Sequence, residues 1–119
     1  MSTMDKKQAE RFYNEVLMIT QGEEGVILID HTTHAPDEQD IRTVEWAMYG
    51  GWIPDEWEWK QHQKDIDGNW SDVDRADRLI WRAQEATDYL NAWCCPPGWW
   101  FGHNPDVGAY GVWRIEKDR

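Results

Sequence analysis

Tryptophan constrains the fold of this chain more than any other residue, because ten indoles must be accommodated within 119 residues. A domain of this length buries roughly two thirds of the surface that its unfolded chain exposes, so we expect a single compact domain over residues 1–119. With 40% hydrophobic residues, the chain is too apolar for intrinsic disorder. One small core nevertheless has limited room for ten large rings, and some of them are expected at the surface.

Helical spacing of apolar residues predicts three helices with recognisable start or stop signals. The first covers residues 5–20. The second begins at Pro36, a favoured first helical residue, and stops at Gly50. The third covers residues 73–93 and must end before Pro96.

The third helix carries an apolar stripe that we expect to face the core. Trp81, on the same helix, is also expected to be a core residue. The residues of the stripe are Val73, Ala76, Leu79, Ile80, Ala83, Ala86, Leu90 and Trp93.

Three short runs predict strands. Residues 26–29 are β-branched or aliphatic and fit a buried strand, while residues 99–103 and 109–115 fit an antiparallel hairpin. The sequence therefore predicts an α+β fold, with about three helices packed on a small antiparallel sheet that includes a C-terminal Trp-rich hairpin.

The segment 54–64 is consistent with two structures. Pro54 and Asp55 resemble the start of a helix, whereas Trp57 and Trp59 alternate with charged residues as in a half-buried strand. The pattern does not decide between them.

The chain has a net charge of −11, and its acidic residues are concentrated in the middle third. Residues 37–77 contain twelve acidic and four basic residues, a net charge of −8. Nucleic acids and anionic membranes are bound through clustered Lys and Arg, so the composition argues against both as direct ligands. The sequence has neither an apolar run of bilayer length nor the apolar segment of a signal peptide, and we expect a cytoplasmic protein.

No motif of a known catalytic class is present, and we expect a protein that is not an enzyme and needs no cofactor. His31 and His34 are weak candidates for a metal site, because two imidazoles three residues apart can share one ion. A small metal-dependent enzyme that uses them is the third functional alternative. Cys94 and Cys95 are adjacent, which disfavours a disulfide between them, and reduced thiols in packing roles are expected.

Carboxylates and tryptophans occur together within residues 37–77, a combination that suits the recognition of a basic protein. Carboxylates steer the approach of a positively charged partner, and indoles are enriched among the residues that dominate binding energy. The predicted partner-binding residues are Asp37, Glu38, Asp40, Glu45, Trp46, Trp52, Asp55, Glu56, Trp57, Glu58, Trp59, Asp72, Asp74 and Asp77.

A large basic groove is typical of proteins that handle nucleic acids. The sequence therefore predicts an inhibitor that occupies such a groove, with its carboxylates in the place of phosphates. In size and charge the chain is similar to small acidic phage-encoded antagonists of bacterial defence, such as anti-CRISPR proteins. This resemblance is one of class and rests on no motif. Homodimerisation through a Trp-rich patch is a further open alternative.

A second interpretation is a binding module for a small ligand such as a nucleotide or a sugar. Aromatic residues of the hairpin would line its pocket, and a phosphorylated ligand would require nearby arginines. The residues predicted for this pocket are Trp99, Trp100, Tyr110, Trp113, Arg78, Arg82 and Arg114.

Overall fold

The computed structural model describes residues 3–29, 36–67 and 74–115, without the side chains of residues 36 and 37. These ranges form four helices and five strands, which confirms the predicted α+β class. In chain order the elements are β1 (Thr3–Met4), α1 (Lys6–Ile19), β2 (Gly25–Ile29), α2 (Pro36–Tyr49), β3 (Trp52–Ile53), α3 (Glu56–Asp67), α4 (Arg75–Trp93), β4 (Trp99–Asn104) and β5 (Ala109–Arg114).

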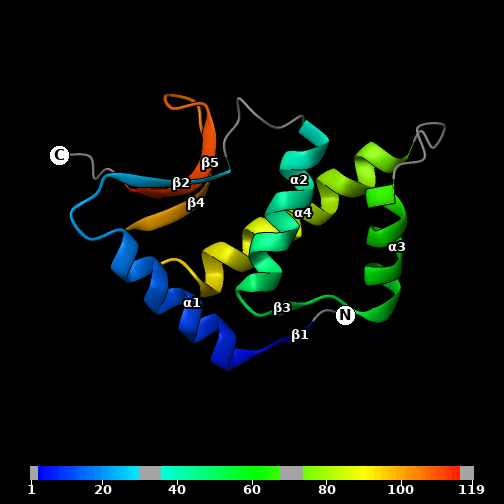
Figure 1. Ribbon diagram of the computed structural model, residues 1–119, viewed down its shortest axis with the longest axis horizontal. Helices are drawn as coiled ribbons and strands as arrows, with labels where there is room; N and C mark the ends of the chain where they lie inside the picture. The colour runs from blue at the N-terminus through cyan, green and yellow to red at the C-terminus, as the bar shows by residue number, and fades with distance from the viewer. Residues whose placement is uncertain (1–2, 30–35, 68–73, 116–119) are drawn as a thin grey trace.

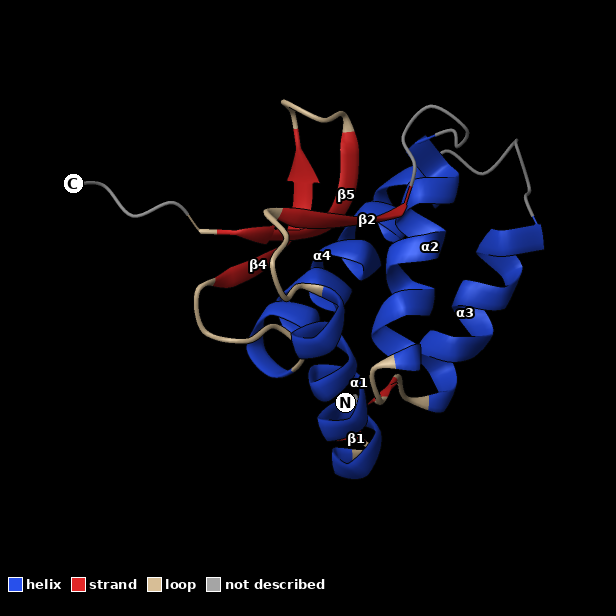
Figure 2. Ribbon diagram, turned by 60° about the vertical axis from the view of Figure 1, so that its left-hand side comes forward, coloured by secondary structure: helices blue, strands red, loops and turns tan. Residues whose placement is uncertain are grey.

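Helices α2 and α4 pack against each other at the centre of the molecule, with a sheet on one side and α3 on the other (Figures 1 and 2). The sheet is antiparallel and has the strand order β2-β5-β4, so the predicted hairpin is confirmed. Strands β1 and β3 form a separate two-stranded ribbon. None of the described helices combines the length and the apolar composition needed to cross a bilayer.

Helix α1 begins where its capping residue predicts. The carboxylate of Asp5 accepts hydrogen bonds from the backbone N–H groups of Lys7 and Gln8, at 3.1 and 3.2 Å. These bonds satisfy two of the donors that a helix start leaves without an intrahelical partner. Phe12 and Val16, one turn apart, then lie buried on the inner face of the helix.

The ambiguous segment 54–64 contributes to a fourth helix, α3, and not to a strand. The carboxylate of Asp55 accepts a hydrogen bond at 2.8 Å from the backbone N–H of Glu58, as a helix-capping residue does. The prediction of about three helices is therefore one short. The alternation of Trp57 and Trp59 misleads because residues two apart lie on different sides of a helix.

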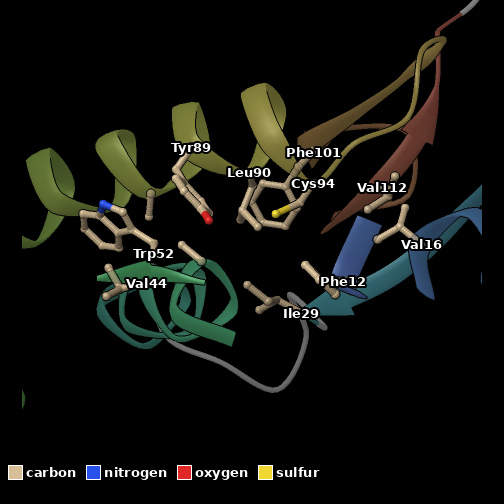
Figure 3. Close-up of a cluster of buried hydrophobic side chains, with 12 residues drawn as sticks. Phe12, Val16, Ile29, Val44, Trp52, Tyr89, Leu90, Cys94, Phe101 and Val112 are labelled. Atoms are coloured by element: carbon tan, nitrogen blue, oxygen red, sulfur yellow. The ribbon is translucent and has the colours of Figure 1, made fainter. Parts of the chain in front are cut away.

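The hydrophobic core lies where α1, α2, α4 and the sheet meet (Figure 3). Ala47 of α2 and Ala86 of α4 are completely buried, and their small side chains allow the two central helices to approach closely. The buried cluster consists of Phe12, Val16, Ile29, Val44, Ala47, Trp52, Ala86, Tyr89, Leu90, Cys94, Phe101 and Val112. None of its members belongs to α3.

Two tryptophans of the hairpin pack over glycines of the sheet. A Cβ atom added to Gly25 would lie 2.2 Å from the ring of Trp113, and one added to Gly102 would lie 2.5 Å from the ring of Trp100. Both glycines are therefore required by the space that the indoles occupy. The indole N–H of Trp113 also donates to the carbonyl oxygen of Gly102 at 2.9 Å, which satisfies its polar atom within the buried site.

Helix α4 is tied to the sheet by one amide side chain. Asn91 donates from Nδ2 to the carbonyl oxygen of Phe101 at 3.0 Å, and its Oδ1 accepts from the N–H of the same residue at 2.8 Å. Replacing Asn91 by leucine is expected to lower the free energy of unfolding by about 1–3 kcal/mol, because both backbone groups lose their partner. Urea unfolding followed by circular dichroism measures this loss. The matched change Ala92→Leu, at a neighbouring exposed position, should leave stability almost unchanged.

The predicted inner stripe of α4 is partly wrong. Leu79, together with Ala83, Ala86 and Leu90, is buried, but Ala76, Ile80 and Trp93 are exposed, as is Trp81, and Val73 lies outside the described residues. The reason is that the buried face of the helix turns toward α3 and includes charged residues, which a hydrophobic pattern does not detect. Two indoles that were expected in the core are thus available at the surface.

Candidate functional site

A buried network of charged side chains joins α3 to α4. Asp65 is only 2% exposed, and its carboxylate accepts hydrogen bonds from Nη2 of Arg78 at 2.7 Å and from Nη2 of Arg82 at 3.1 Å. Arg75 donates from Nε to the carbonyl oxygen of Asp65 at 2.7 Å. Nδ1 of His62 accepts a hydrogen bond from Nη1 of Arg82 at 2.9 Å, since a guanidinium group can only donate.

Burial and pairing set the protonation of this network. Burial raises the pKa of Asp65, but hydrogen bonds from Arg78 and Arg82 outweigh it and hold the pKa below its ordinary value of 3.8. Burial, together with the positive charge of Arg82, lowers the pKa of His62 from 6.5 to about 4. At neutral pH the network therefore contains an ionised carboxylate and a neutral imidazole.

Two carboxylates influence each other toward the other end of the same helix pair. The helices run antiparallel, so the contacts that begin at Asp65 progress toward the start of α3, where Glu58 lies within electrostatic range of Glu85. Burial raises the pKa of Glu58, and the negative charges of Glu85 and Asp55 raise it further. Within the described part of the chain, neither Glu58 nor Glu85 forms an ion pair with Lys or Arg.

Exposed indoles flank this carboxylate pair. Trp57 directly precedes Glu58 and is 72% exposed, and Trp81 lies one helical turn before Glu85 and is 67% exposed. Further exposed carboxylates continue on both helices. We call this region the α3–α4 surface and define it as Asp55, Glu56, Trp57, Glu58, Asp77, Trp81, Glu85 and Asp88.

The α3–α4 surface has to be interpreted from its own chemistry. No protein family, no curated protein and no solved structure matches this chain. The roles of its residues are therefore argued from burial, contacts and charge.

Sequence reasoning identified one side of the α3–α4 surface and missed the other. The contribution of α3 and Asp77 of α4 were among the predicted partner-binding residues, whereas Trp81, Glu85 and Asp88 were not. The missing signal is present in the sequence, because these three residues and Asp77 recur at intervals of four, four and three, which places them along one side of a helix. The acidic third of the chain ends at residue 77, so a prediction limited to that third does not include Trp81, Glu85 and Asp88.

Three of the four tryptophans that were predicted to bind a partner lie outside the α3–α4 surface. Trp52 is 4% exposed and belongs to the hydrophobic core, so it is not available to a partner. Trp46 is partly buried and packs beside Phe12 on the inner side of α2. Trp59 is 37% exposed and lies beside the ring of His62, with a centroid distance of 6.1 Å.

The remaining predicted acidic residues do not extend the α3–α4 surface. Glu45 forms an ion pair with Arg42 at 3.0 Å on α2, the helix that also carries Glu38 and Asp40. Asp74 is exposed and is the N-terminal capping residue of α4. The side chain of Asp37 and all of Asp72 lie outside the described residues, so their predicted role is not located.

The predicted hairpin pocket is not assembled as one site. Arg78 and Arg82 bind Asp65 near the start of α4, whereas the hairpin lies beside the opposite end of this helix (Figure 1). Arg114 does reach the hairpin rings, and its guanidinium group stacks over Trp99 at 5.2 Å from the centroid. The remaining predicted rings, Trp100, Tyr110 and Trp113, are partly or fully buried in the sheet.

The described residues give no support for a metal site or for a reactive thiol. His31 and His34 lie outside the described residues, and those that are described contain no group of three or more metal-binding side chains. Burial raises the pKa of Cys94 to about 12 and that of Cys95 to about 11. Both thiols are therefore protonated at neutral pH and poor nucleophiles, in agreement with a packing role.

Proposed function

We propose that the α3–α4 surface binds a basic protein that handles nucleic acids and blocks the groove in which that protein holds its nucleic acid. The observation that carries this proposal is that Glu58 is partly buried within electrostatic range of Glu85, that neither carboxylate forms an ion pair with Lys or Arg in the described chain, and that exposed indoles lie on the same two helices. Like charges near each other favour a ligand that brings positive charge.

The electrostatics of Glu58 support a cationic partner in particular. The pKa of this group is raised, so the free protein resists its ionisation. A lysine or arginine placed beside Glu58 and Glu85 would offset both the burial and the mutual repulsion, and would lower the pKa again. Binding of such a partner should therefore release protons near the raised pKa of Glu58.

Trp57 and Trp81 supply apolar contact area, which the carboxylates alone do not provide. Tryptophan is among the residues most enriched at binding hot spots, and both of these rings are largely exposed. Carboxylates would accelerate the encounter, and the indoles would slow dissociation. Self-association through the same face would oppose acidic side chains of two copies, which favours a different partner over a homodimer.

Nucleic-acid mimicry is the most specific part of the proposal. A row of carboxylates on two neighbouring helices resembles a phosphate backbone in charge, and a groove that selects phosphates would accept it. Inhibition of a bacterial defence protein is one biological setting for such a partner.

The test compares two variants with equal charge. In the first, Asp55→Asn, Glu58→Gln and Glu85→Gln remove three charges from the α3–α4 surface, and asparagine retains the capping bond at residue 55. In the control, Glu10→Gln, Glu24→Gln and Asp106→Asn remove three charges from exposed positions elsewhere. Candidate partners are proteins of a cell lysate that immobilised wild-type protein retains at about 50 mM salt and releases at about 500 mM.

For a purified partner, the first variant should associate at least about tenfold more slowly than wild type, and the control should change much less. Replacing Trp57 and Trp81 by alanine should mainly accelerate dissociation, with little effect on folding because both rings are exposed. Surface plasmon resonance measures both rates. A salt-insensitive complex, equal losses in the two charge variants, or a partner that binds the protein and its nucleic acid simultaneously would contradict the proposal.

A further inference from the structure

A second concave site lies on the other side of the molecule from α3, between α1, β2 and α2. Its cavity has a volume of about 560 Å³, within the range of small-ligand sites. We call it the α1–α2 pocket. Its lining residues are Phe12, Glu15, Ile19, Leu28, Ile29, Arg42, Glu45, Trp46 and Tyr49.

The interior of the α1–α2 pocket is aromatic and apolar. Phe12 and Ile29 are fully buried, and they continue the hydrophobic core up to the cavity. Trp46 is stacked on Phe12 at 5.7 Å between centroids, and Tyr49 meets both rings edge-on, at 5.1 Å from Phe12 and 5.8 Å from Trp46. Three mutually packed rings form a rigid wall that suits a flat apolar group.

The charged residues of the pocket leave a net negative charge. Arg42 is paired with Glu45 at 3.0 Å, so its positive charge is already compensated. Glu15 forms no ion pair with Lys or Arg among the described residues, although Arg11 lies within electrostatic range of Tyr49, and it accepts a hydrogen bond from the hydroxyl of Tyr49, with oxygen distances of 2.9 and 3.2 Å. This bond holds the Glu15 carboxylate beside the aromatic wall and leaves further acceptor positions on its oxygens.

We propose that the α1–α2 pocket binds a small organic cation with an aromatic or similarly flat apolar body and one ammonium group. The body would lie against the rings of Phe12, Trp46 and Tyr49, and the ammonium group would bind Glu15 near the face of an aromatic ring. Phosphorylated ligands are excluded by the same charges, because the pocket holds two carboxylates and its arginine is paired. This inference does not depend on the function proposed for the α3–α4 surface.

Tryptamine is a suitable probe, since it combines an indole with a primary amine. Two related compounds separate the contributions, namely 3-ethylindole, which has no charge, and indole-3-acetate, which carries the opposite charge. Each is titrated into the protein of residues 1–119, and binding is followed by the NMR signal of the Trp46 indole N–H, assigned with a Trp46→Phe variant. We expect tryptamine to bind with a Kd below about 1 mM and indole-3-acetate at least about tenfold more weakly.

The change Glu15→Gln should weaken tryptamine binding at least about tenfold and leave the weaker binding of 3-ethylindole unaltered. The control Glu10→Gln removes an exposed carboxylate from the same helix and should change neither. Thermal unfolding checks that both variants fold, and Tyr49→Phe provides a second test, because loss of the hydroxyl frees Glu15 to move. Equal binding of the amine and the acid, or no shift of the Trp46 signal up to about 10 mM tryptamine, would overturn the assignment.

Discussion

Replacing Asp65 by alanine is expected to lower the free energy of unfolding by about 3–5 kcal/mol. The buried carboxylate binds Arg78 and Arg82. Its removal leaves the guanidinium group of Arg82 with little access to water and no counter-charge. Breaking one side of a buried ion pair is costly for that reason, even where the intact pair contributes little net stability. Equilibrium unfolding in urea measures the loss.

Asp67→Ala is the matched control for this change, because Asp67 is an exposed carboxylate at the end of the same helix. Its replacement should alter stability by no more than about 0.5 kcal/mol. A similar loss in the two variants would mean that helix α3 tolerates neither substitution and that the network around Asp65 has no special role. A small loss for Asp65→Ala alone would show that Arg82 finds water or another partner.

Lowering the pH from 7 to 4 is expected to destabilise the wild-type protein by about 3 kcal/mol more than a His62→Gln variant. Above pH 6.5 the imidazole is neutral in both the folded and the unfolded chain, and its contribution is complete. Below this value the unfolded chain takes up a proton that the folded chain resists until pH about 4, so stability falls across this interval. Glutamine can still accept the bond from Arg82 but does not titrate.

Free energies of unfolding measured at several pH values give the difference directly. His103→Gln serves as the control for the loss of an imidazole, because His103 is exposed on β4 and lies outside the network of α3 and α4. Further loss is expected at still lower pH, where Asp65, whose pKa lies below 3.8, becomes protonated. Parallel profiles for wild type and His62→Gln would show that the imidazole is not shielded as its burial indicates.

Local signals account for the parts of the fold that the sequence predicted. Asp5 and Pro36 define the starts of α1 and α2, and Pro96 limits the end of α4, because capping and backbone geometry depend on neighbouring residues alone. The hairpin could be predicted equally well, since its two strands are close in sequence. By contrast, the choice between helix and strand for residues 54–64 depended on packing against α4, through contacts such as that of His62 with Arg82, which lie far apart in sequence.

The buried charges could not be anticipated in the same way. Arginines such as Arg78 and Arg82 are typical of the exposed face of a helix. Only the folded structure shows that both bind the buried Asp65, which lies thirteen and seventeen residues earlier. Arg82 is part of the buried face of α4, whereas its neighbour Trp81 is exposed, contrary to expectation. The candidate site was thus half predicted: its α3 side follows from composition, and its α4 side depends on a tertiary contact.

Helix α3 adds no residue to the hydrophobic core, and the contacts described above attach it to α4 through ionic and hydrogen-bonded groups. The stability of this attachment therefore depends on pH, whereas that of apolar packing does not. Mild acid would weaken the attachment of this helix and, by neutralising Glu58, reduce the attraction of the α3–α4 surface for a cationic target. The pH would then determine both how stably α3 is attached to α4 and how strongly the α3–α4 surface attracts a cationic partner.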